Sequence, residues 1–204
     1  KLNELKKSTI DLEMPAGATP YTQPYRNIGV STLRKFDVFY THSVEELADR
    51  IVFPVRDVMG RNVVFVARHA LSNGNPRYVN YPRGVQIPLF PVVLEEKYSS
   101  IILVEGIMDM LNLYDKGIHN AVACFGTSTL KGAVSEKLLP FKAQGVTKIY
   151  IMFDGDTAGR EAAKELKPLI EECGFEVQNI DLPDDSDPGD LGQEDVDSIK
   201  EYIK

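Results

Sequence analysis

The stretch YIMFDGDTAG, residues 150–159, runs from four mostly apolar residues directly into two aspartates separated by one glycine. The apolar run has the composition of a buried strand, which places Asp154 and Asp156 just beyond its carboxyl end. Two carboxylates this close repel each other unless a positive group lies between them. An aspartate pair of this kind is also common as a helix cap or a solvated turn, so the pair alone decides nothing about function.

From residue 99 onward the chain alternates between strand and helix patterns. Near-continuous apolar runs, typical of buried strands, occur in SIILVEG, NAVACFG, KIYIMFDGD and FEVQNIDLP. Amphipathic patterns predict helices in IMDMLNLYDKG, in residues 128–144 and in TAGREAAKELKPLIEECG. Apolar strands that alternate with helices predict an α/β fold with a mostly parallel sheet covered by helices on both faces. In such sheets the ligand site lies beyond the carboxyl ends of the strands.

Carboxylates follow three of these strands, at the edge where a ligand is expected. The set consists of Glu105, Asp109, Asp154, Asp156, Asp187 and Asp190. Because no histidine or cysteine lies nearby in the sequence, these oxygen ligands suit a hard cation, Mg²⁺ or Mn²⁺, and two such ions can serve phosphoryl transfer. Cys124 and Cys173 lie far apart and form no CxxC pair, so no zinc site is expected in this chain.

The first hundred residues differ from the rest in charge and in pattern. Residues 1–100 carry 13 basic and 10 acidic side chains, whereas residues 101–204 carry 10 and 20, and eight of the 13 basic residues are arginines. Arginine is the better phosphate ligand, so a basic surface beside an acidic site is predicted. An unevenly charged, solvated surface is the alternative. The runs IVFPVRD and NVVFVARHAL predict an antiparallel hairpin, and short helices are predicted at residues 31–36 and 43–50.

The sequence also predicts a location. No apolar run approaches the roughly 20 residues that a bilayer span needs, and the opening KLNELKKSTI lacks the apolar core of a signal peptide. We therefore expect a cytoplasmic protein that has no membrane partner.

Three segments, VEGIMDML, FDGDTAGR and DSDPGDL, resemble the three signatures of the Toprim fold. Primases, type IA and type II topoisomerases, some nucleases and a recombination mediator share that fold. The resemblance implies that Glu105 is an acid/base or metal-site residue. It also implies a set of metal-site aspartates, namely Asp109, Asp154, Asp156 and Asp187. Many members have a further aspartate directly after the DP pair or one residue later; here Gly189 intervenes and Asp190 is the candidate.

The segments YRNIGVSTLRKF, RIVFPVRDVMGRNVVFVARHAL and PRYVNYP resemble the amino-terminal subdomain of the RNA-polymerase domain of DnaG-type primases. The resemblance covers residues 25–192. It implies that template and nucleotide are bound by Arg68, Arg77, Tyr78 and Asn80. Four other basic residues are weaker candidates: Arg34, Lys35, Arg56 and Arg61. A lysine that the family usually has after this region is missing, and only Arg83 stands there.

This resemblance implies a DNA primase catalytic core, in a bacterial or phage-infected cell, that makes short RNA primers on single-stranded DNA from ribonucleoside triphosphates. It implies that the catalytic residues are Glu105, Asp154 and Asp156 and that the enzyme uses two Mg²⁺ or Mn²⁺ ions. The expected organisation is an arm at 1–24, an α+β lobe with an antiparallel sheet at 25–98, a Toprim domain at 99–192 and a C-terminal helix or further subdomain at 193–204. The zinc-binding module of the family is expected to be absent, and a replicative helicase would bind through regions absent here. The alternatives are DNA cleavage by a Toprim nuclease or topoisomerase, and a non-catalytic DNA-binding scaffold.

Overall fold

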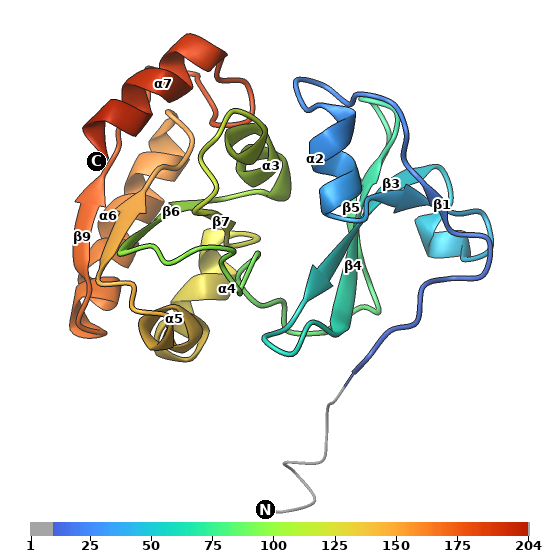
Figure 1. Ribbon diagram of the computed structural model, residues 1–204, viewed down its shortest axis with the longest axis horizontal. Helices are drawn as coiled ribbons and strands as arrows, with labels where there is room; N and C mark the ends of the chain where they lie inside the picture. Colours follow the sequence, from blue (N-terminus) through green and yellow to red (C-terminus); the bar gives the residue numbers. More distant parts are fainter. Residues whose placement is uncertain (1–9, 204) are drawn as a thin grey trace, which may run out of the picture. The chain divides into compact units, whose positions relative to one another are not determined.

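The computed structural model describes residues 10–203, which form two compact units with the elements labelled in Figure 1. Within these residues, the first unit comprises 10–22 and 33–87, and the second comprises 23–32 and 88–203. This division differs from the predicted boundary near residue 98, since residues 23–32 and 88–98 both group with the second unit. Hydrogen bonds explain the difference: Gly29 and Thr32 bind the carboxylate of Asp115, and Phe90 exchanges two backbone hydrogen bonds with Ala123. Part of the predicted arm, residues 1–9, lies outside the described residues.

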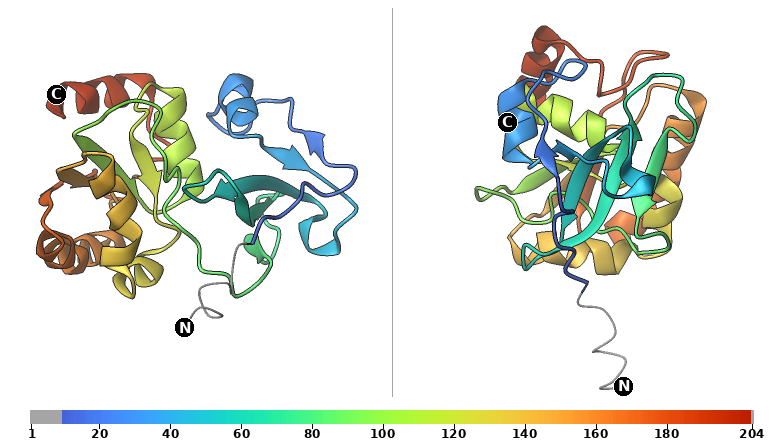
Figure 2. Two further views of the ribbon diagram at one scale, coloured as in Figure 1. Left: turned by 60° about the horizontal axis from the view of Figure 1, so that its bottom comes forward. Right: turned by 90° about the vertical axis from the view of Figure 1, so that its right-hand side faces the viewer.

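The first unit is built on an antiparallel sheet of five strands in the order β1-β2-β3-β4-β5. The strands are β1 (Thr19–Pro20), β2 (Phe39–Tyr40), β3 (Arg50–Arg56), β4 (Asn62–His69) and β5 (Tyr78–Tyr81). Strands β3 and β4 form the predicted hairpin and run side by side in Figure 2, right. Its turn is held by Asp57, whose Oδ1 accepts hydrogen bonds from the backbone N–H groups of Met59 and Arg61.

One of the two predicted short helices in this region forms and the other does not. Helix α2 (Val30–Lys35) agrees with the helix predicted at 31–36. The helix predicted at 43–50 is reduced to a single 3-10 turn, η1 (Glu45–Leu47). Arg50 already pairs with His69 in the sheet, and Asp49 adopts a left-handed backbone conformation with φ of 57°. Strand pairing therefore overrides the local helical pattern.

The second unit is built on a parallel sheet of four strands in the order β7-β6-β8-β9, as the alternating pattern predicts. The strands are β6 (Ser100–Val104), β7 (Ala121–Ala123), β8 (Lys148–Ile151) and β9 (Glu176–Asn179). The helices are α3 (Ile107–Asp115), α4 (Thr127–Lys131), α5 (Val134–Ala143), α6 (Thr157–Glu172) and α7 (Gln193–Tyr202). The helical region predicted at 128–144 thus forms two helices, α4 and α5. No helix within residues 10–203 is long and apolar enough to cross a membrane.

Alternate residues of the parallel strands enter different layers, because successive side chains in a strand point to opposite faces. Ile101 and Leu103 of β6 belong to one buried cluster together with Phe141 of α5 and Ile170 of α6. On β8, Tyr150 faces the other way, and its ring centroid lies 6.5 Å from that of Tyr202 in α7. Full burial of one such apolar side chain contributes roughly 1.5–3 kcal/mol. Because a slip of one residue would exchange the two faces of a strand, this burial keeps the strand ends in one register.

Candidate active site

The predicted acidic residues gather at the carboxyl edge of the parallel sheet. Glu105 directly follows β6, and Asp154 and Asp156 follow the neighbouring strand β8. Because adjacent parallel strands end at the same edge, these side chains are brought close, and the charges of Asp154 and Asp156 both raise the pKa of Glu105. Asp109 and Asp187 interact electrostatically with Asp154 as well. The structure therefore brings five of the six predicted carboxylates together.

Asp156 has a structural task in addition to its place at this edge. Its Oδ1 accepts a hydrogen bond of 2.7 Å from the backbone N–H of Gly159 and so caps the first turn of α6. The alternative interpretation of the aspartate pair as a helix cap therefore applies to Asp156, which caps α6 through one of its two carboxylate oxygens. The cap leaves the second carboxylate oxygen of Asp156 outside this hydrogen bond.

Two glycines are required in this turn because the backbone approaches itself closely. A Cβ atom on Gly155 would lie 2.0 Å from the carbonyl oxygen of Pro183, and one on Gly159 would lie 2.2 Å from that of Asp154. Gly155 also donates its N–H to the carbonyl of Ser186 at 2.8 Å. The loop that follows β8 is therefore fastened to the loop that precedes Asp187.

Asp109 and Asp187 face a small space at Gly189. A Cβ atom on Gly189 would lie 2.8 Å from Oδ1 of Asp109 and 2.9 Å from Oδ1 of Asp187. The other oxygen of Asp109 accepts the N–H of Gly106 at 2.7 Å. In contrast, Oδ1 of Asp187 is buried and accepts no hydrogen bond within residues 10–203. Because Gly189 has no Cβ atom, no side chain at this position comes between the orphaned oxygen of Asp187 and the neighbouring oxygen of Asp109.

The pKa values of the cluster report an unbalanced negative charge. Burial raises the pKa of Asp109 to about 7, and the charges of Asp154, Asp187 and Glu105 add to the shift. Burial also raises the pKa of Glu105, with the charge of Asp154 as the next cause. The pKa of Asp154 is raised by burial and then by Asp187 and Asp156. A cation among these groups would relieve both causes.

Asp190 differs from the other predicted carboxylates. Its Oδ1 lies 2.7 Å from Nη2 of Arg26, and its side chain is 57% exposed. The charge of Asp190 is therefore already balanced by a protein cation. Its predicted role as a metal ligand stays a prediction that the ion pair makes less favourable.

The donor set fits Mg²⁺ or Mn²⁺ only in an open arrangement. Within residues 10–203, no three histidine, cysteine, aspartate or glutamate side chains already converge as ligands of one ion. Mg²⁺ does not require such a cage, because it keeps several waters and binds through one or two carboxylates together with substrate phosphates. The orphaned oxygen of Asp187 and the space at Gly189 suit an ion held in this way.

The predicted template residues lie on the first unit, around strand β5. Arg68 is only 6% exposed, and it stands opposite Tyr78 in the antiparallel register. Its Nη1 donates to the Tyr78 hydroxyl at 2.5 Å, and its guanidinium lies 5.2 Å from the centroid of the ring. Arg77, Tyr78 and Asn80 are exposed. Arg68 therefore orients the exposed ring of Tyr78, whereas the other three side chains can reach a ligand.

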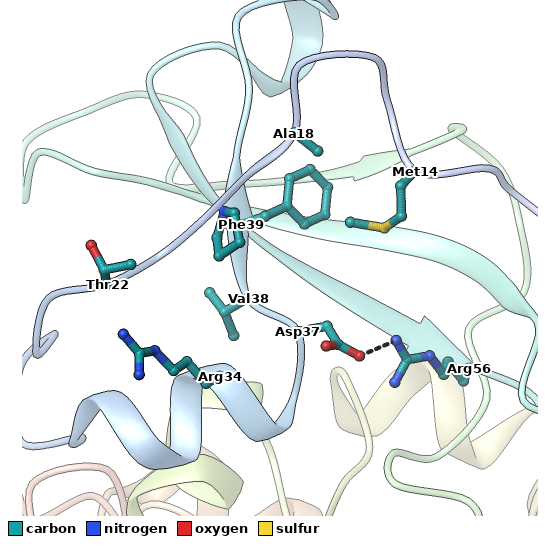
Figure 3. A pocket seen from close by; sticks show the side chains of 9 residues that line it. Met14, Ala18, Thr22, Arg34, Asp37, Val38, Phe39 and Arg56 are labelled. Atoms are coloured by element: carbon teal, nitrogen blue, oxygen red, sulfur yellow. Dashed lines mark hydrogen bonds and ion pairs between the residues drawn. The ribbon is translucent and has the colours of Figure 1, made fainter.

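Two of the weaker basic candidates are engaged in ion pairs. Arg56 pairs with Asp37 at 2.5 Å, as drawn in Figure 3, and Arg61 pairs with Asp57 at 2.6 Å. Arg34 and Arg56 border a pocket of about 690 Å³ in the first unit. The other residues that line this pocket are Met14, Ala18, Pro20, Thr22, Asp37, Val38 and Phe39.

Two residues that hold the site, Asn112 and Arg26, are not among the site residues predicted from the sequence. Asn112 is fully buried in α3, where its side-chain amide binds the loop that carries Asp187. Arg26 reaches Asp190. A signal for Asn112 was present, because Asp109, Asn112 and Lys116 are spaced three and four residues apart and so share one face of a helix. No local signal connects Arg26 with a residue 164 positions away.

Comparisons in sequence agree with the motifs. Residues 102–191 match the family described as Toprim-like. A DNA primase of Aquifex aeolicus (strain VF5) is 34% identical over 163 residues, which are 76% of this chain and 30% of that protein. A DNA primase of Pseudomonas aeruginosa is 34% identical over 162 residues, 72% of this chain and 23% of that protein. The chain thus spans less than a third of the length of these relatives.

Comparisons of structure lead to the same group of proteins. The zinc-binding and RNA-polymerase domains of the Aquifex aeolicus primase match with a TM-score of 0.69 and 28% identity, over 86% of this chain and 53% of that one. The primase fragment of the bacteriophage T7 primase-helicase protein matches in fold with a TM-score of 0.70 and 20% identity, over 99% and 85% of the two chains. The chain therefore carries the Toprim fold and is a relative, in sequence and in structure, of the DnaG-type DNA primases.

Proposed function

We propose that this chain is the catalytic core of a DNA primase, which joins ribonucleotides into short RNA primers on a single-stranded DNA template. The observation that carries the proposal is the group of half-buried carboxylates at the edge of the parallel sheet, with raised pKa values and an orphaned oxygen on Asp187. The 34% identity to primases supports it. A DnaG catalytic domain bound to single-stranded DNA has the same fold, with a TM-score of 0.63.

The residues that would hold two Mg²⁺ or Mn²⁺ ions are Asp109, Asp154, Asp156 and Asp187, and Glu105 would serve either as a further ligand or as the proton acceptor. Asp190 is left out of this set because Arg26 already pairs with it. When bound, the ions would offset the charge of the triphosphate and stabilise the leaving pyrophosphate. The protein contributes by holding Glu105, Asp154 and Asp156 just beyond the ends of two neighbouring parallel strands, with Asp109 on α3 and Asp187 on a loop beside them, so that little rearrangement is needed when the nucleotide arrives.

Glu105 is the residue that we propose to accept a proton. In nucleotidyl transfer, the 3′-hydroxyl oxygen forms a bond to the α-phosphorus while the bond from that phosphorus to pyrophosphate breaks. The hydroxyl proton moves to the Glu105 carboxylate. Glu105 lies at the same edge as Asp154 and Asp156, directly beyond strand β6, which is where the proton is released if the nucleotide binds there.

The exposed residues of β5 are proposed to contact the template. The ring of Tyr78 is 38% exposed and held by Arg68, so a base can stack on it without an ordering cost for the ring. Arg77 can pair with a phosphate, and Asn80 lies two residues beyond Tyr78 on the same face of the strand.

Replacing Tyr78 by alanine is expected to weaken binding of single-stranded DNA roughly tenfold, because stacking of one base on an aromatic ring contributes about 1–3 kcal/mol. Fluorescence anisotropy with a labelled oligonucleotide measures this change. Tyr78→Phe is the matched control, since it keeps the ring and loses only the hydroxyl that binds Arg68. Equal affinity of Tyr78→Ala and the wild type would show that the ring is packing only.

The test of the function is synthesis of RNA from labelled ribonucleoside triphosphates on mixed-sequence single-stranded DNA. We expect short products that require both the template and Mg²⁺ or Mn²⁺. A parallel reaction with supercoiled plasmid tests the nuclease alternative. Nicked plasmid without RNA would favour a cleavage enzyme. The absence of both activities and of Mn²⁺ binding would favour a scaffold, and either result would overturn the proposal.

A further inference from the structure

The loop of residues 187–191, which carries Asp187 and Gly189, is held by the buried side-chain amide of Asn112. Asn112 of α3 is 0% exposed, and its Nδ2 donates to the carbonyl of Pro188 at 2.8 Å and to that of Leu191 at 3.1 Å. Both protons of the amide are thus used on the two ends of this loop. An amide buried in an apolar helix is costly unless it is fully bonded, so the bonds define one position of the loop.

The acceptor end of the same amide connects the loop to a distant part of the chain. Oδ1 of Asn112 accepts a hydrogen bond from Nζ of Lys116, one turn further along α3. Nζ of Lys116 also donates to the backbone carbonyl of Asn27 at 3.2 Å. Lys116 therefore joins residues 25–32 to the amide that holds the 187–191 loop.

Residues 25–28 form a narrow turn that presents Arg26. Tyr25 and Ile28 exchange two backbone hydrogen bonds of 3.1 Å, and Arg26 between them adopts a left-handed conformation with φ of 51°. This conformation is unfavourable for a side chain larger than that of glycine or asparagine, and it persists only where the surroundings hold it. Here Ile28 is buried, and the carboxylate of Asp115 fixes the segment at Gly29 and Thr32.

The strained turn brings the Arg26 guanidinium to the outer end of the 187–191 loop, 2.7 Å from Oδ1 of Asp190. The loop is thus bonded at its base by Asn112 and at its exposed side by Arg26. Between these two attachments, Asp187 keeps its orphaned oxygen next to Asp109 at Gly189. All of these contacts lie within the second unit.

We propose that Asn112, Lys116 and Arg26 form a positioning set that holds Asp187 beside Asp109 and thereby determines the affinity of the site for a divalent cation. The inference rests on the proposed function only in assuming that a cation binds there. Residues that orient metal ligands without touching the metal typically change its affinity by about 10- to 100-fold when they are lost. None of the three residues is assigned a role in the reaction itself.

Binding of Mn²⁺ to the full chain tests the inference without any need for activity. Isothermal calorimetry or the loss of the free Mn²⁺ signal in electron paramagnetic resonance gives the dissociation constant. We expect Asn112→Ala to weaken Mn²⁺ binding by about tenfold or more. Lys148→Ala removes an ion pair with Glu176 elsewhere in the same unit and should leave the constant unchanged.

The variant Arg26→Ala distinguishes a positioning role of Arg26 from a purely electrostatic one. Loss of a cation near the site makes the site more negative, so a purely electrostatic role predicts tighter Mn²⁺ binding. The positioning role predicts weaker binding, about threefold or more, with partial recovery in Arg26→Lys because the ion pair can re-form. Arg26 is partly exposed, so this variant keeps the experiment decisive even where Asn112→Ala fails to fold.

The possible results have distinct meanings. Weaker Mn²⁺ binding by Arg26→Ala, with an unchanged melting temperature, supports the inference. Unchanged or tighter binding overturns it and leaves the proposed function intact. A wild-type chain that binds no Mn²⁺ overturns the proposed metal site and this inference with it. A wild-type chain that binds Mn²⁺ but makes no RNA contradicts only the proposed reaction, because the positioning set is still measured.

Discussion

The variant Glu105→Gln is expected to slow primer synthesis by at least about a hundredfold, since loss of a general base typically costs 10²- to 10⁴-fold. Glutamine keeps the size of glutamate and one carbonyl oxygen, but it cannot accept the proton of a 3′-hydroxyl. The carboxyl group of Glu105 is half-buried, and its pKa is raised by burial and by the charge of Asp154. Single-turnover extension at saturating Mn²⁺ measures the chemical step.

The binding of Mn²⁺ to the same variant decides between the two roles of Glu105. A proton acceptor predicts that Glu105→Gln binds Mn²⁺ within about threefold of the wild type. A metal ligand predicts that rate and affinity fall together. Glu161→Gln, at an exposed position of α6, is the matched control and should change neither quantity. A rate for Glu105→Gln within a few-fold of the wild type would contradict both roles.

The second large effect is expected for Asp109→Asn in the absence of metal. The pKa of Asp109 is raised to about 7 from an ordinary value of 3.8, so the folded state binds a proton more tightly than the unfolded state does. Over the pH range from about 4 to about 7, the folded chain therefore carries more protons, and its stability falls as the pH rises. Above pH 7 the folded state bears the full cost of this charge. Asparagine removes the charge and can still accept the Gly106 N–H.

Each pKa unit corresponds to about 1.4 kcal/mol, so removing the charge should raise stability at pH 8 by a few kcal/mol. The melting temperature in EDTA at pH 8 is then expected to increase by roughly 5 °C, and the increase should vanish near pH 4. Asp197→Asn is a control that should change the melting temperature in the opposite direction, because hydrogen bonds from Lys200 and Gln193 lower the pKa of Asp197 and so favour its charged form in the folded state. A lower melting temperature for Asp109→Asn at pH 8 would show that the carboxylate charge stabilises the metal-free protein.

The architecture of the second unit could be predicted because its signals are local and consistent. Buried parallel strands are apolar on both faces, so their runs in the sequence are nearly continuous, and each is followed by a helix pattern. The order of strands and helices from residue 99 to Asn179 follows this pattern. The carboxylates could be predicted as a group for the same reason: parallel strands end at one edge, and Glu105 and Asp154 follow two neighbouring strands.

The features that could not be predicted depend on contacts between distant residues. Asp115 accepts hydrogen bonds from residues 86 and 83 positions away, and these bonds assign residues 25–32 to the second unit. The ion pair that occupies Asp190 spans 164 positions. The helix expected at 43–50 is lost to strand pairing with a partner on β4. In each case the local sequence pattern contains only one of the two residues in contact, and the other is brought beside it only when the chain folds.

The division of the second unit into residues 23–32 and 88–203 has a consequence for recombination between related proteins. A chimaera that exchanges only a contiguous Toprim segment, residues 99–192, would separate Asp115 from Gly29 and Thr32 and Asp190 from Arg26. The transplanted domain would keep every carboxylate and lose the groups that bind two of them. A functional exchange would have to move residues 23–32 together with the later segment, although 55 residues of the other unit lie between residues 32 and 88 of the chain.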